Sequence, residues 1–271
     1  MKAREAMHSA GNRTNRLTRF FATAFAGAWL AWLPIVLGTD GLAVLPVRVP
    51  VDLAFVGTFT GPMFAAFIVS NRTERRDLLA RMFMVRMAPW VYAAAVLLPP
   101  VAILAVTLAF SDEPIPVSRW GLYAGSLVPF LVLGSIAGPW GEEPGWRGFA
   151  LQRLLVRFSP VRASLLLGVI WALWHLPIVL FVPAFRGGMS VGAFVPTYVA
   201  AVCALSFFMT WLYCGSGGSV LATIMAHAAW NAAVGVQDRL AVHPDRRLPL
   251  VSAALLLAII ALTVSRFLRS R

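Results

Sequence analysis

The chain has 271 residues, of which 59% are hydrophobic and only 13% are charged, and its mean hydropathy is +0.78. A soluble domain carries about 25% charged residues, so this composition excludes an ordinary water-soluble protein and indicates one built to lie in lipid. The formal net charge of +12 does not indicate a nucleic-acid partner, because the arginines cluster at the ends of apolar runs and form no single basic stripe.

The predicted elements are membrane-spanning helices, because an apolar run of about 20 residues is long enough to cross the core of a bilayer. The first run, FFATAFAGAWLAWLPIVLG, has the length of a span and lacks the cleavage site of a signal peptide. We therefore expect an all-α, polytopic integral membrane protein with about eight transmembrane helices. The expected spans are 20–38, 51–70, 90–110, 120–138, 163–183, 195–214, 219–236 and 249–267.

The basic residues between these runs predict how the chain is oriented. Of the 23 lysines and arginines, 17 lie in segments expected on the same side as the N-terminus and 6 lie in segments on the other side. The positive-inside rule then places both termini, and the segment 139–162 with them, on the cytoplasmic side. Four parts are expected: a basic tail at 1–19, transmembrane helices 1–4 at 20–138, a catalytic core at 139–236, and the last helix with a basic C-terminal tail at 237–271.

The stretch GEEPGWRG at residues 141–148 places two carboxylates in an otherwise apolar chain. Glu143 and Arg147 are four residues apart, so on a helix they share a face in the favourable orientation. That pairing would leave Glu142 free to act. Pro144 allows an alternative, in which a helix begins at the proline and both carboxylates lie near its positive end. A purely structural salt-bridge cluster beside a basic loop is the competing interpretation.

Two histidines also fall inside predicted spans. His175 lies in VIWALWHLPIVL, with Trp171 one turn earlier, where the indole could cover one side of the imidazole. His227 and Asn231, in TIMAHAAWNAAVG, share a helical face. Buried hydrogen bonds between helices would explain each of them alone. An ionisable group costs at least about 2.5 kcal/mol at the bilayer centre, so their concentration on a few helices favours a functional site.

Glutamate, histidine and asparagine are the groups that hydrolysis requires. A carboxylate can take a proton from water, an imidazole can share or return it, and further donors can hold a developing oxyanion. Two histidines and a glutamate are also suitable ligands for zinc. The sequence contains no H-E-x-x-H, the helix motif of zinc proteases.

These stretches resemble the motifs of the CPBP family, the CAAX-prenyl-protease and bacteriocin-processing intramembrane proteases. The E-E-x-x-x-R motif corresponds to residues 142–147, followed by the usual glycine, Gly148. The second motif, an aromatic residue and a histidine four positions later, corresponds to 171–175, with tryptophan where phenylalanine is more usual. The H-x-x-x-N motif corresponds to 227–231. The resemblance covers about 139–236, and the three motifs occur in the expected order.

The resemblance implies a role for each motif residue. Glu142 would be the water-activating base with His175 assisting it, and His227 with Asn231 would stabilise the oxyanion. The residues expected to support the site are Glu143, Arg147 and Trp171.

The resemblance leaves the metal question open, since both metal-dependent and metal-independent glutamate mechanisms are described for the family. If a metal such as zinc is bound, the candidate ligands are Glu142, His175 and His227.

The expected function is therefore that of an intramembrane endopeptidase acting on a peptide or protein that reaches a cavity from the cytoplasm or from the lipid. The arginine-heavy composition suggests a bacterial plasma membrane, where peptide maturation or bacteriocin immunity is more plausible than processing of CAAX proteins. Two alternatives stay open. The chain could be a non-catalytic immunity or scaffold protein, or a transporter that uses the buried ionisable groups, although no second repeated half is found. The sequence does not define the oligomeric state.

Overall fold

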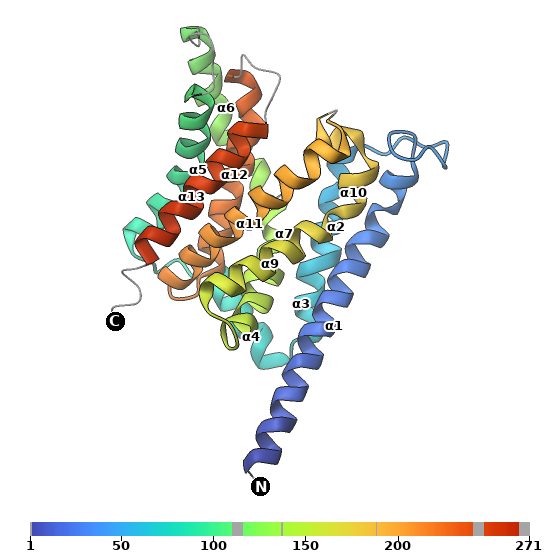
Figure 1. Ribbon diagram of the computed structural model, residues 1–271, viewed down its shortest axis with the longest axis vertical. Coiled ribbons are helices and arrows are strands. Elements are labelled where there is room, and N and C mark those ends of the chain that lie inside the picture. Colours follow the sequence, from blue (N-terminus) through green and yellow to red (C-terminus); the bar gives the residue numbers. More distant parts are fainter. Residues whose placement is uncertain (1, 110–115, 137, 188, 241–246, 266–271) are drawn as a thin grey trace.

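The computed structural model describes residues 2–109, 116–136, 138–187, 189–240 and 247–265, and within these ranges it is helical, with no strand (Figure 1). The α-helices are α1 Lys2–Leu37, α2 Phe55–Thr58, α3 Phe64–Val69, α4 Arg72–Met82, α5 Pro89–Ala109, α6 Val117–Ile136, α7 Pro139–Gly145, α8 Gln152–Leu155, α9 Pro160–Trp174, α10 Leu176–Phe181, α11 Val191–Gly215, α12 Val220–Leu240 and α13 Arg247–Ser265. Short 3₁₀ or π segments are η1 Val51–Ala54, η2 Phe59–Met63, η3 Trp146–Leu151 and η4 Pro183–Arg186.

The described residues confirm an all-helical membrane protein. Four stretches are long and apolar enough to cross a bilayer, namely Asn15–Leu37, Val51–Val69, Pro89–Ala109 and Val191–Gly215. Two shorter apolar helices, Pro160–Trp174 and Val220–Val236, pack among them. The count of eight spans and the cytoplasmic placement of both termini stay predictions.

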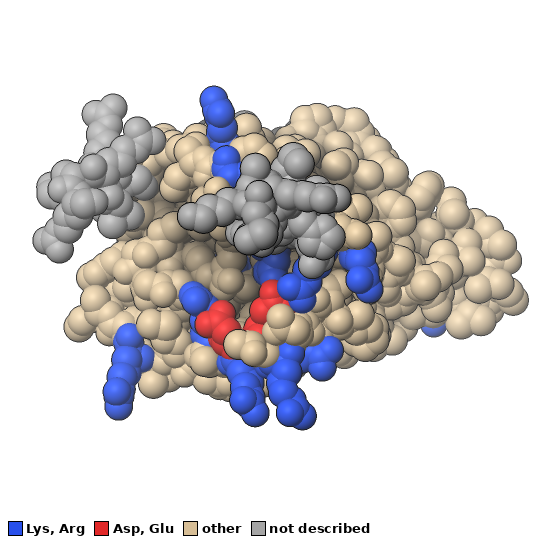
Figure 2. All heavy atoms as spheres, turned by 90° about the horizontal axis from the view of Figure 1, so that it is seen from below, with Lys and Arg blue, Asp and Glu red and all other residues tan. Residues whose placement is uncertain are grey.

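The lower end of the bundle in Figure 1 is the end where α1 begins and α4 lies, and charged residues gather there (Figure 2). Arg16 of α1 and Arg153 of α8 both donate to the carboxylate of Glu74, at 2.7–3.0 Å and 2.8 Å. Glu74 also closes a capping box with Asn71 at the start of α4. Figure 2 views this end directly and shows basic side chains surrounding a few carboxylates. We call it the arginine-rich end.

The first half of the segment 139–162, which was expected at the cytoplasmic face, is buried inside the helical bundle. Gly138 and Pro139 begin a new helix after α6, and α7, η3 and α8 run through the bundle, with every residue from Gly141 to Leu151 buried. The helix does not begin at Pro144, because α7 already includes it and the next turn widens to a π-helix. Only residues from about 153 onward reach the arginine-rich end.

Candidate active site

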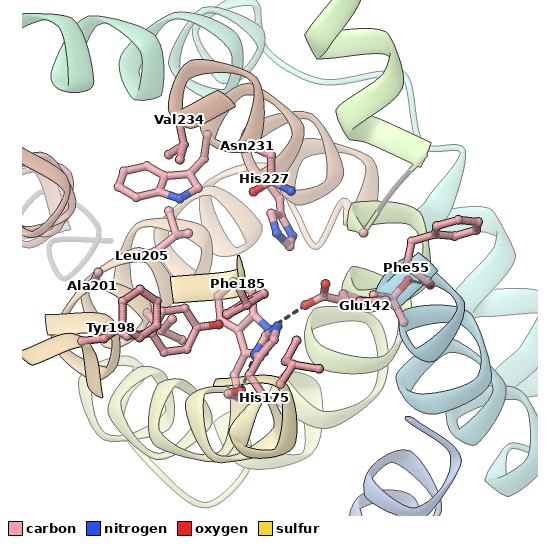
Figure 3. Close-up of a pocket in the computed structure, with 18 of the residues that line it drawn as sticks. Phe55, Glu142, His175, Phe185, Tyr198, Ala201, Leu205, His227, Asn231 and Val234 are labelled. Carbon is pink, nitrogen blue, oxygen red and sulfur yellow. Dashed lines mark hydrogen bonds between the residues drawn. The ribbon is translucent and has the colours of Figure 1, made fainter. Parts of the chain in front are cut away.

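A cavity of about 410 Å³ lies among α1, α2, α7, α9, α11 and α12 (Figure 3). Most of its lining is apolar or aromatic, which is typical of ligand sites that are oriented by a few polar groups. The four residues predicted to be catalytic all line it, although they come from three separate parts of the chain: Glu142, His175, His227 and Asn231.

Glu142 is held by a tryptophan. The indole Nε1 of Trp171 donates to its Oε2 at 2.6 Å, and the glutamate is only 4% exposed. No described residue donates to Oε1. A Cβ placed on Gly138 would lie 3.2 Å from Oε1, so the glycine leaves room for the carboxylate at this wall of the cavity. One carboxylate oxygen is thus fixed, and the other has no partner among the residues that the structure describes.

His175 follows the last turn of α9, and its ring is enclosed by aromatic side chains. Its Nδ1 lies 3.0 Å from the carbonyl oxygen of Trp171. Since a carbonyl can only accept, Nδ1 carries the proton and Nε2 keeps a lone pair when the ring is neutral. The ring centroid lies 4.5 Å from that of Trp174 and 5.6 Å from that of Tyr198. Packing and one hydrogen bond therefore fix both the tautomer and the orientation of this imidazole.

His227 is paired with the second glutamate of the motif. Its Nδ1 lies 2.9 Å from Oε1 of Glu143, and the same oxygen accepts from Nη1 of Arg147 at 2.8 Å. The expected pairing of Glu143 with Arg147 is present, and both side chains of this ion pair are fully buried. The contact between Glu143 and His227 could not be anticipated from spacing, because 84 residues separate them.

Asn231 lies one turn after His227 on α12. It lines the cavity, and its Nδ2 lies 3.7 Å from the position that a Cβ on Gly138 would occupy. Asn231 and Glu142 therefore flank the same glycine. The sequence motifs did not predict a role for Gly138. Its position directly before the proline that begins α7 is the feature that could have indicated one.

Trp171 contacts more of the site than expected. Besides the bond to Glu142, its ring lies 4.5 Å from the guanidinium carbon of Arg147, a cation–π contact. The edge of His227 faces the same ring, with centroids 5.3 Å apart. The indole was expected to cover His175, but their centroids are 6.4 Å apart and the direct link is through the backbone carbonyl.

An aromatic wall, consisting of Phe185, Phe194 and Tyr198, closes the side of the cavity next to His175. Its rings pack on one another with centroid distances of 5.3–6.2 Å. These residues come from η4 and the first half of α11, and none of the sequence motifs predicted their place in the site.

The three candidate metal ligands all line the cavity but are not closely grouped. Across the residues that the structure describes, no three His, Cys, Asp or Glu side chains are grouped so that they could hold a metal ion. Oε2 of Glu142 accepts from Trp171, and Nδ1 of each histidine also has a partner in the protein. Oε1 of Glu142 and Nε2 of each histidine take no part in these bonds, and histidines that bind a metal usually donate their other ring nitrogen in this way. Zinc binding therefore stays a prediction.

Comparison with known proteins now adds to this geometry. Residues 124–233 match the family model described as type II CAAX prenyl endopeptidase Rce1-like. CAAX prenyl protease 2 of the archaeon Methanococcus maripaludis is 26% identical over 259 residues, covering 86% of this chain and 87% of the relative. The chain is thus similar to CAAX prenyl endopeptidases, in agreement with the resemblance of its motifs to the CPBP family. This similarity supports protease activity, while the bacterial plasma membrane stays a prediction because this relative is archaeal.

Proposed function

We propose that this protein is an intramembrane endopeptidase of the CPBP type, in which Glu142, with His175, activates the attacking water. The observation that supports the proposal best is the convergence of four polar side chains from α7, the α9–α10 junction and α12 on one apolar cavity. One oxygen of Glu142 is fixed by Trp171, which leaves the other to accept a proton. Enclosure in apolar surroundings strengthens such electrostatic interactions.

In the proposed reaction, Oε1 of Glu142 accepts a proton from water as the water oxygen attacks the peptide carbonyl carbon. Nε2 of His175 accepts a hydrogen bond from the same water and orients it. The proton then passes to the peptide nitrogen as the carbon–nitrogen bond breaks, giving a carboxylic acid and an amine. Base catalysis of this kind contributes about 10²- to 10⁴-fold.

His227 and Asn231 supply the donors for the oxyanion. The amide of Asn231 donates through Nδ2. Since Nδ1 of His227 already donates to Glu143, His227 can donate through Nε2 only as an imidazolium, and the Glu143 carboxylate stabilises that form. In this proposal Glu143 is a positioning residue for His227 as well as the counter-ion of Arg147.

The shape of the cavity also favours hydrolysis over transport. A transporter needs a path that can reach both faces, whereas the residues from Gly141 to Leu151 are buried without interruption below Glu142. No lysine or arginine is found among the described residues that line the cavity. Its apolar and aromatic surface suits an uncharged, apolar stretch of peptide, and this is the substrate class we propose.

The test uses purified full-length protein in nanodiscs with a library of fluorogenic apolar peptides. Glu142→Gln keeps the size of the side chain and an acceptor for Trp171, so we expect a folded variant with hydrolysis reduced by about 10²-fold or more. Trp29→Phe is the matched control, because it loses a single indole hydrogen bond, to the carbonyl of Trp174, and does not line the cavity.

A second readout does not depend on the choice of library. Peptides from membranes that contain the wild type or Glu142→Gln are compared by mass spectrometry, and products should occur only with the wild type. Equal cleavage by both proteins would refute the role of Glu142, and no product from either would favour the non-catalytic scaffold. A zinc chelator should leave hydrolysis unchanged.

A further inference from the structure

The cavity lies toward one end of the bundle. The contact between Arg16 and Glu74 marks the arginine-rich end of α1. The ring of Trp32 lies 6.0 Å from that of His175. Along α1, Trp32 is about 24 Å from Arg16, at a rise of roughly 1.5 Å per residue. The same rise leaves only about 8 Å from Trp32 to the end of α1 at Leu37. Within a bilayer core of about 30 Å, His175 is therefore much closer to the other end.

The side of the site that faces the arginine-rich end is closed by packed aromatic rings. Trp146 contacts Phe20 and Trp174, with centroid distances of 5.8 and 5.6 Å, and Phe149 stacks on Phe20 at 4.8 Å. The buried ion pair of Glu143 and Arg147 lies in the same layer of the bundle. A peptide would have to separate these helices to reach Glu142 from that end.

Toward the opposite end, the cavity extends between chain connections. Its lining includes Ala54 and Phe55, which follow the connection 38–50. It also includes Phe185 of η4 and Met189, which lies between η4 and α11. The layout in Figure 1 places both connections at the end away from α4. We call this the arginine-poor end.

The basic residues of the described chain are divided unequally between the two ends. At the arginine-rich end there are five in residues 2–19, five in 72–86 and three in 153–162. At the arginine-poor end there are five, of which Arg48 pairs with Asp40 and Arg186 is buried against backbone carbonyls: Arg48, Arg119, Arg186, Arg239 and Arg247. The positive-inside rule places the richer end in the cytoplasm.

Combining the charge bias with the position of the cavity, we propose that the active site opens to the non-cytoplasmic face of the membrane. The substrate is then a peptide whose apolar segment is presented outside the cytoplasm or in the outer half of the bilayer. This reverses the expectation of access from the cytoplasm, and it rests on the proposed function. A secreted peptide, or the outer end of a membrane segment, has the required position and chemistry.

Orientation is tested first, without any assay of hydrolysis. In a background with Cys203→Ala and Cys214→Ala, single cysteines replace two exposed threonines: Thr39→Cys at the arginine-poor end and Thr73→Cys on α4. A membrane-impermeant maleimide added to intact cells should label Thr39→Cys and leave Thr73→Cys unlabelled until the membrane is permeabilised. The reverse pattern would overturn the proposal and leave the endopeptidase assignment untouched.

Access is tested next, in sealed vesicles of known orientation. A fluorogenic peptide with a charged tail that prevents it from crossing lipid should be cleaved by right-side-out vesicles and not by inverted ones. In the same cysteine background, Ala54→Cys places a thiol in the cavity lining, and labelling it from the arginine-poor side should abolish cleavage. Cleavage only by inverted vesicles would overturn the proposal. Failure of the proposed function would instead appear as equal activity of wild type and Glu142→Gln in nanodiscs.

Discussion

Trp171 links most of the polar groups of the site. It donates to Glu142, its carbonyl accepts from His175, and its ring contacts both Arg147 and His227. Phenylalanine, the more usual aromatic at this motif position, would keep the ring contacts and could not donate. The tryptophan therefore adds a fixed hydrogen bond on the carboxylate to which we assign the role of base.

Substituting Trp171→Phe separates the donor from the ring. A hydrogen bond to a charged group is worth about 1.5–3 kcal/mol, so kcat should fall by about 10- to 100-fold, with little change in KM because the apolar lining is kept. Steady-state kinetics in nanodiscs measure both constants. Trp171→Ala should lower kcat further. If the role of Trp171 were purely structural, kcat would instead fall equally in the two variants and in proportion to their loss of thermal stability.

The ion pair of Glu143 and Arg147 makes a second prediction at this scale. Both side chains are fully buried, and Glu143 Oε2 has no hydrogen-bond partner among the described residues. Glu143→Gln leaves a buried guanidinium without a counter-ion, which costs about 3–5 kcal/mol of unfolding free energy, measured by denaturant titration in detergent. Adding Arg147→Met should recover part of the loss. If the double variant is less stable than Glu143→Gln alone, the buried charge is not the cause.

At the scale of elements, α7 reaches its position by packing against η2 without side chains between the backbones. A Cβ on Gly145 would lie 2.5 Å from the carbonyl oxygen of Pro62 and 2.7 Å from its carbonyl carbon. These atoms belong to the backbone and cannot turn aside. The glycine thus sets how closely α7 approaches η2, and with it the position of Glu142.

Gly145→Ala should therefore push the two elements apart. Overpacking of this kind costs about 1–3 kcal/mol, and displacement of Glu142 should lower kcat as well. Gly121→Ala in α6 is the matched control, because a Cβ there meets nothing within 4 Å. Thermal unfolding in detergent should show reduced stability for Gly145→Ala alone. An equal loss of stability in Gly121→Ala would show that the close approach of α7 to η2 is not the cause.

For the molecule as a whole, Glu74 holds α1, α4 and α8 together at the arginine-rich end. Glu74→Ala removes a capping box, worth about 1 kcal/mol, and two partly exposed ion pairs, each worth about 0–1 kcal/mol. We expect a loss of about 1–2 kcal/mol in unfolding free energy with activity kept below the transition. Asp77→Ala, which breaks only the pair with Arg81, should cost less; an equal loss would show that Glu74 has no special linking role.

Composition and spacing predicted the helical membrane fold, the three motifs and the partner of Arg147, because each depends on local periodicity or bulk hydropathy. They did not predict that Glu143 also contacts His227, nor the aromatic wall, because these contacts join segments far apart in the chain. The extent of burial around Glu142 was not predicted either. Hydropathy detects the end of an apolar run at the GEEPGWRG stretch, whereas burial in the structure continues through it to Leu151.

The crowding of indole rings around the site gives the protein a built-in spectroscopic signal. Trp32 and Trp174 lie 4.7 Å apart between centroids, and Trp174 lies 5.6 Å from Trp146, with all three side chains almost completely buried. Rings held this close in fixed, chiral geometry should give an intense near-ultraviolet circular dichroism band, which disappears when tertiary packing is lost even if helices persist. Loosening of the aromatic layer below Glu142 should then be visible separately from loss of helix.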